Sequence, residues 1–371
     1  MTGSKSKNKK LNKNNRWRYS TKSERRGFVS AMYIISIAAV LQLFLYDILP
    51  GTIYGFIYGF LFFIEGLFAP EFLYSLNPEE IHHMTGSAVM VLSSAAASLA
   101  TGAFIILCMK KFVLKPGAGD TAKTNRQDED RVRIKKFKLP KNTPALIAVG
   151  LCISQLSVFV YIALNYFLYS VFGVASHIHS DIDMYLPQTA AGAIMFFMAS
   201  VIAPSIFEEF IFRYAMLNSL RKYGDIFAVA ATSVLFGFAH ARMSAFIYAT
   251  AVGAFSAYIA LKTKSIWFSI ILHAAVNGVA FVMQYLSAAF TWDSALPDII
   301  YFAYLSFISA VSLIYLIIYI IKRRNAGPAP PKKRVYISNG RKLLLFFNAA
   351  SLIFFVLVIL RSAEEYGFLC I

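Results

Sequence analysis

Long apolar segments separated by short polar links are the main pattern of this chain. Each segment is rich in Ile, Leu, Val, Phe and Ala, and most approach the roughly 20 residues that a helix needs to cross a bilayer. The pattern predicts an all-α fold, a polytopic membrane helical bundle with about nine transmembrane helices. The nine segments are residues 28–49, 86–109, 145–172, 188–217, 226–240, 244–261, 266–289, 297–321 and 343–361.

A tenth apolar stretch, residues 51–70, carries Gly51, Gly55 and Gly59 at a spacing typical of close helix packing. Counting it as a span would place the basic link 110–141 opposite the N-terminal tail. We therefore expect an outward loop there, either re-entrant or interfacial.

Basic residues gather in the links, and with nine spans every basic cluster falls on one face. By the positive-inside rule that face is cytoplasmic. The N-terminus is then inside and the C-terminus outside, and the first apolar segment is a signal anchor because it is long enough to span and lacks a cleavage site. The basic clusters are residues 5–26, 110–141, Arg221-Lys222, Lys262 with Lys264, and 322–342.

The same pattern divides the chain into five parts. The charged loop is expected to be mobile, because it has few apolar residues to bury. The parts are a basic cytoplasmic tail (1–27), N-terminal membrane helices (28–109), a charged cytoplasmic loop (110–144), a membrane core expected to be catalytic (145–321, with its motifs in 204–277), and a basic linker with a C-terminal membrane helix (322–371).

Composition supports a membrane protein and argues against two other classes. Of the 371 residues, 58% are hydrophobic and 15% are charged, against about a quarter charged in soluble domains. The net charge of +17 comes from the links, and no segment offers a basic face on a soluble domain, so we expect no nucleic-acid partner. Cys108, Cys152 and Cys370 are far apart and indicate neither a disulfide framework nor a metal site.

Three polar clusters interrupt the apolar segments within about seventy residues. They are Glu208-Glu209-x-x-x-Arg213, Phe236-x-x-x-His240 and His273-x-x-x-Asn277. An unpaired polar group at bilayer depth costs several kcal/mol, so such groups usually pair or carry out chemistry. The clusters therefore predict one polar site assembled from neighbouring helices.

The first cluster divides its carboxylates between two tasks. Glu209 and Arg213 are four residues apart on one helical face and can form an ion pair, whereas Glu208 lies about 100° around the helix. Glu208 is thus the candidate general base or acid, and Glu209 with Arg213 could be only a pair that holds helices together. Pro204 cannot donate to the carbonyl of Ser200, so a kink or opening is expected there.

The other two clusters add polar side chains that can act on a reacting carbonyl. Phe236 and His240 share a face, and so do His273 and Asn277. The imidazole and amide of His273 and Asn277 could bind a developing oxyanion, or could serve as interhelical hydrogen-bond donors only. Two further groups, His82 with His83 and the run from His177 to Asp183, lie in predicted outer loops and show no convincing metal-ligand set.

The order and spacing of the three motifs resemble the CPBP family, the type II CaaX prenyl endopeptidases and bacteriocin-processing or immunity proteins. The resemblance covers about residues 185–290, and Tyr214 departs from it where many members have Gly. It implies an intramembrane endopeptidase of a bacterial plasma membrane. In it Glu208 with His240 activates a water, His273 and Asn277 hold the oxyanion, and Glu209 and Arg213 are supporting.

The resemblance leaves the cofactor and the substrate open. A mechanism without metal is the preferred one, and the alternative is zinc bound by Glu208, His240 and His273. The expected partners are the lipid bilayer and a membrane-associated peptide or protein substrate. Two rival interpretations are a non-catalytic scaffold or immunity protein of the same fold, and a transporter whose buried charges form an ion path.

Overall fold

The computed structural model describes residues 17–19, 21–68, 78–113, 131–134, 143–172, 186–187, 189–240, 243–289, 296–325 and 334–365. Helices dominate these residues, and every predicted apolar segment coincides with one or more of them. The long helices are α2 (Lys22–Phe68), α4 (Pro78–Phe112), α6 (Thr143–Phe172), α11 (Asp225–Ala239), α12 (Met243–Thr263), α13 (Trp267–Ala289), α14 (Leu296–Asn325) and α16 (Ala349–Glu365).

Helix α2 begins at a capping box and is longer than one membrane span. The Thr21 hydroxyl accepts from the Glu24 amide at 3.2 Å, and the Glu24 carboxylate accepts from the Thr21 amide at 2.9 Å. The helix continues through Pro50 for 47 residues, about 70 Å at 1.5 Å per residue. The expectation of an outward loop at 51–70 was therefore wrong, because residues 51–68 extend α2.

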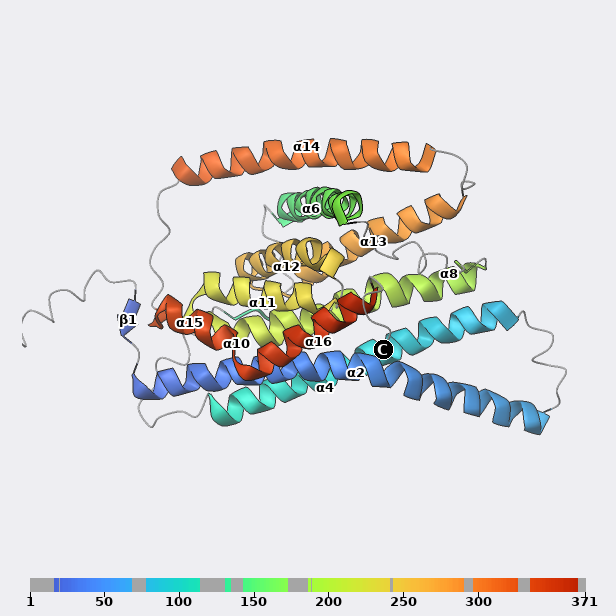
Figure 1. Cartoon of the computed structure of the whole chain (residues 1–371), viewed down its shortest axis with the longest axis horizontal. Helices are drawn as coiled ribbons and strands as arrows, with labels where there is room; N and C mark the ends of the chain where they lie inside the picture. The colour runs from blue at the N-terminus through green and yellow to red at the C-terminus, as the bar shows by residue number, and fades with distance from the viewer. Residues whose placement is uncertain are drawn as a thin grey trace, which may run out of the picture.

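The helices pack in layers (Figure 1). Helices α2 and α4 lie together and extend beyond the rest of the bundle as a two-helix arm. Helices α11 and α12 pack on each other in the centre, α6 covers α12, and α14 lies on the outside of α6. Helix α16 crosses α2, so its C-terminal segment closes the bundle on the side of the N-terminal helix.

The number of membrane crossings is not fixed by helix length alone. Six helices of the described residues are long and apolar enough to cross a membrane. A bent pair, Asn339–Phe346 with Ala349–Ala363, makes up to seven. Helix α11 and the apolar part of α14 coincide with predicted spans but are shorter than the roughly 20 residues that a membrane crossing needs. The all-α membrane bundle is confirmed, and the count of nine stays a prediction.

Two short segments outside the helices are paired. Strand β1 (Trp17–Tyr19) lies parallel to β2 (Arg334–Tyr336), which joins the N-terminal tail to the link before α15 (Asn339–Phe346). Residues 131–134, inside the link that we expected to be mobile, pack against the bundle with Val132 buried. These four residues are therefore attached to the bundle, and the mobility expected for the link stays a prediction.

Candidate active site

The helix that carries the first motif is interrupted by two π-helical turns. It runs through α8 (Ala190–Phe197), α9 (Ala203–Glu209) and α10 (Asn218–Leu220), with π-helical η1 (Met198–Ile202) and η2 (Phe210–Leu217) between them and 3₁₀ turn η3 (Arg221–Tyr223) at its end. We call residues 190–220 the motif helix. Such π turns inside α-helices occur often at functional sites.

The backbone carbonyl of Ser200, to which Pro204 cannot donate, has a partner on another helix. Pro204 has no amide hydrogen to give to the carbonyl of Ser200, and the side chain of Asn277 from α13 donates to that carbonyl instead, at 3.3 Å. This bond ties the third motif to the backbone of the first. It uses one of the two N–H groups of the Asn277 amide and leaves the other for a second acceptor.

Glu209 lies between two basic side chains at the centre of the bundle. Its carboxylate contacts the Arg213 Nε at 3.1 Å and the His273 Nδ1 at 3.3 Å. Glu209 and Arg213 are 0% exposed, and His273 is 3% exposed. The predicted pair of Glu209 with Arg213 is therefore present, and it also reaches the third motif.

One aromatic ring contacts all three motifs. The Phe236 ring lies 4.9 Å from the His240 ring and 5.6 Å from the His273 ring, both edge-to-face. The Arg213 guanidinium lies 4.9 Å from the same ring, and the Phe212 ring packs edge-on at 5.1 Å. In the described part of the chain neither Nη atom of Arg213 has a hydrogen-bond acceptor, so the aromatic faces supply much of its environment.

His240 stands at the C-terminal end of α11 and is exposed. Its Nδ1 lies 2.9 Å from the carbonyl oxygen of Phe236. A carbonyl oxygen can only accept, so this contact requires the proton on Nδ1. In a neutral ring Nε2 then carries the lone pair, which suits it to act as a base.

Glu208 is half-buried, whereas Glu209 next to it is fully buried. It interacts electrostatically with Arg213 and with Tyr46 of α2. The Tyr46 hydroxyl also lies 3.0 Å from the Ser94 hydroxyl of α4. Sequence reasoning missed Tyr46, because a single tyrosine in an apolar segment gives no signal of what it faces in the fold.

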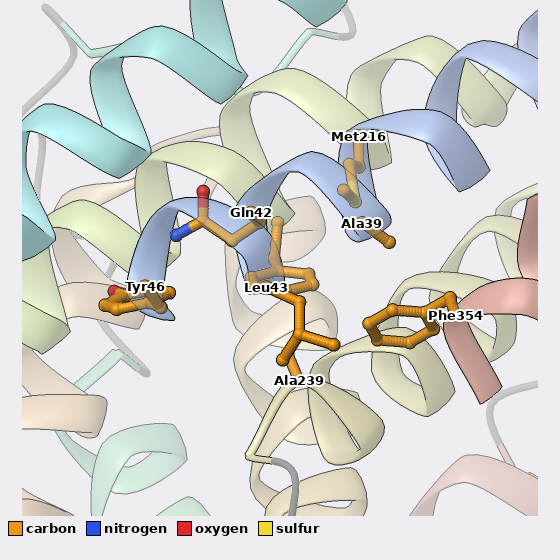
Figure 2. Close-up of a pocket in the computed structure, with 8 residues that line it drawn as sticks. Ala39, Gln42, Leu43, Tyr46, Met216, Ala239 and Phe354 are labelled. Atoms are coloured by element: carbon orange, nitrogen blue, oxygen red, sulfur yellow. The ribbon is translucent and has the colours of Figure 1, made fainter. Parts of the chain in front are cut away.

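A small cavity of about 10 Å³, roughly the room of one water, lies beside this cluster. Figure 2 shows Gln42, Leu43 and Tyr46 of α2 lining it together with Ala239 and Phe354. Ala239 immediately precedes His240, and Tyr46 interacts with Glu208. The cavity borders the candidate site and contains none of the predicted catalytic side chains.

The zinc alternative finds little support in the arrangement. Among the described residues no group of three His, Cys, Asp or Glu side chains is placed to hold a metal ion, so Glu208, His240 and His273 do not converge as ligands. We derive no step through a metal.

The other histidines considered as metal ligands do not lie in the candidate active site. His82 contacts the hydroxyls of Tyr54 and Tyr58 at 2.9 and 3.3 Å, far along the arm of α2 and α4. The side chain of His83 and residues 177–183 lie outside the described part of the chain.

Comparison with known proteins supports the family resemblance of this segment. Residues 189–279, about a quarter of the chain, match the family model of the Rce1-like type II CAAX prenyl endopeptidases. A protein of Bacillus subtilis (strain 168) named "Putative membrane peptidase YdiL" is 32% identical over 117 residues, which is 31% of this chain and 47% of that protein. The chain thus spans about half the length of this curated relative, and no solved structure matches. The protein is an integral membrane protein, and its motif segment is similar to the Rce1-like type II CAAX prenyl endopeptidases.

Proposed function

We propose that this protein is an intramembrane endopeptidase and that its three motifs form one active site. The observation that carries the proposal is the placement of Phe236. Its ring contacts Arg213, His240 and His273, which come from three different helical segments. A purely structural motif has no need to place an exposed imidazole on the same aromatic ring as a buried arginine and a buried histidine, and an enzyme that must bind and activate water does.

Glu208 and His240 are assigned to activate the water. Glu208 takes a proton as the water oxygen attacks the carbonyl carbon of the peptide bond, and Nε2 of His240 orients the water. The resulting tetrahedral intermediate carries its negative charge on the former carbonyl oxygen. When the carbon–nitrogen bond breaks, the proton held by Glu208 passes to the leaving amine.

His273 and Asn277 are assigned to the oxyanion. The bond from Asn277 to the Ser200 carbonyl fixes the amide so that its second N–H can point to the substrate. His273 faces Glu209 through Nδ1, so it donates to the oxyanion through Nε2 when both ring nitrogens carry protons. Glu209 holds the His273 ring in this orientation through the contact with Nδ1, which gives Glu209 a positioning role.

The name of the Bacillus subtilis relative and the membrane location favour a substrate that is a membrane-associated peptide or protein. We assign the protein to a bacterial plasma membrane with its N-terminus in the cytoplasm, because the basic links then lie on the cytoplasmic face. The interpretation as a scaffold or immunity protein differs in one respect, since it does not require Glu208.

A comparison of the membrane peptides of two matched cell lines tests this proposal. Cells carrying the native protein and cells carrying Glu208→Gln at equal abundance are compared by mass spectrometry of membrane peptides. We expect at least one membrane-associated peptide to accumulate uncleaved only with Glu208→Gln. Identical peptide sets, together with unchanged cell behaviour, would favour the scaffold.

A further inference from the structure

Residues 131–134, which we call the strap, cross the ends of two helices that carry the candidate site. The strap lies in the charged link between α4 and α6, outside the segment that matches the family. Its Val132 side chain is 1% exposed and belongs to the main hydrophobic core. It is attached on one side to the motif helix and on the other to the turn before α13.

Asn218 makes the attachment to the motif helix. Its Oδ1 accepts from the Val132 amide at 3.0 Å, and its Nδ2 donates to the Val132 carbonyl at 3.0 Å. The same Nδ2 also donates to the Tyr214 carbonyl at 2.8 Å, which fixes the side chain on its own helix. One amide therefore satisfies both backbone groups of a buried residue, as a neighbouring β-strand would.

The turn between α12 and α13 makes the second attachment. The Arg133 amide donates to the Lys264 carbonyl at 3.1 Å, and the Arg133 carbonyl accepts from the Ile266 amide at 3.2 Å. The Trp267 indole donates to the Ile134 carbonyl at 2.6 Å. Lys264 adopts φ 57°, a left-handed conformation that costs a non-glycine residue free energy. A strained turn is therefore retained where it meets the strap.

We propose that the strap positions the motif helix and α13 relative to each other, with Asn218 as its principal positioning residue. Asn218 lies nine residues after Glu209, and Ile266 lies seven residues before His273. At 1.5 Å per residue both attachments are about 10–14 Å from the contact between Glu209 and His273. A strap that clamps both helix ends at this distance sets the spacing of that contact.

Matched variants separate the strap from the helices that it joins. Asn218→Ala removes both bonds to Val132. Arg133→Pro removes the amide that donates to Lys264 without altering either helix, and Arg133→Ala is its control because it loses the same side chain and keeps the amide.

The reactivity of His273 toward diethylpyrocarbonate, measured by mass spectrometry on the intact purified protein well below its Tm, is the readout. His240 is the internal reference because it is exposed. We expect His273 labelling to rise about fivefold in Asn218→Ala and Arg133→Pro, the factor for losing about one net hydrogen bond. Arg133→Ala should match the native protein, because it keeps the backbone amide that donates to Lys264.

Native protection of His273 in both Asn218→Ala and Arg133→Pro would overturn the proposal. So would a rise in Asn218→Ala alone, which would assign the effect to the bond with Tyr214. In peptide cleavage, which rests on the proposed function, we expect kcat to fall in the two detached variants with KM unchanged. If neither the native protein nor any variant cleaves peptides, the proposed function fails. The labelling of His273 still tests whether the strap positions the two helices.

Discussion

The buried ion pair makes a specific stability prediction, which uses Glu209→Gln, Arg213→Met and their combination. Both native side chains are 0% exposed and their charged atoms are 3.1 Å apart. Removing one member of a buried pair leaves an uncompensated charge and costs about 3–5 kcal/mol. The two single changes should not be equal, because Glu209 also contacts His273, which can offset its charge, whereas Arg213 would retain only the more distant Glu208.

For a chain of 371 residues the loss amounts to about 5 °C in Tm. We expect Glu209→Gln to lose most and Arg213→Met to lose less. The double variant should be more stable than the sum of the single losses predicts, by about 2 kcal/mol, because it leaves no unpaired charge. The Tm values of the native protein, the two single variants and the double variant are measured by heating the purified proteins in one detergent. The folded fraction is determined by size-exclusion chromatography, and Glu208→Gln is the control.

Glu208→Gln should keep a Tm close to that of the native protein, because Glu208 is half-buried and lies outside the pair. Additive losses in the double variant, or single losses as small as that of Glu208→Gln, would refute the account of a buried pair that links the first and third motifs.

Three further predictions concern chemistry and topology. Asn277→Leu should lower kcat about 10²–10³-fold, the usual effect of losing one oxyanion donor, and a kcat within threefold of native in steady-state cleavage would remove Asn277 from that role. Strong chelators should leave the cleavage rate largely intact, whereas stoichiometric zinc whose removal and return switch activity off and on would show the metal mechanism. External cysteine labelling of intact cells should reach positions 176–184 and 364–370 and should not reach 120–130, and labelling of 120–130 would overturn the nine-span topology.

Hydropathy located the helices well, because lipid requires long apolar segments whatever their neighbours. The positive-inside argument failed at residues 51–68, because this apolar stretch was interpreted as an outward loop to keep the basic links on one face. The structure keeps these residues helical and extends α2 instead. The count of crossings is not a local property, since helices such as α11 are shorter than a bilayer is thick.

The site was predictable as far as helical spacing reaches. The pair of Glu209 with Arg213 follows from a separation of four residues, and the different direction of Glu208 follows from a separation of one. The contact between Glu209 and His273 joins residues 64 apart. Such a contact depends on how whole helices pack, and no pattern within either helix encodes it.

The two remaining surprises have the same origin. Tyr46 faces Glu208 from a helix more than 150 residues away in sequence, and Val132 looks like an isolated apolar residue in a charged link. The role of each residue depends on its tertiary contacts, which the local sequence does not encode. Pro204 was a partial exception, because its missing amide drew attention to the Ser200 carbonyl, which accepts from Asn277. The kink or opening expected there stays a prediction.

Cleavage of a membrane-associated peptide by purified Glu208→Gln protein tests the central claim most directly. Single-turnover rates are measured for the native protein and for this variant at equal folded concentration, with Tm measured on the same samples. The account predicts that Glu208→Gln abolishes cleavage while its Tm stays near the native value. Retention of most of the native rate by a folded Glu208→Gln protein would contradict it.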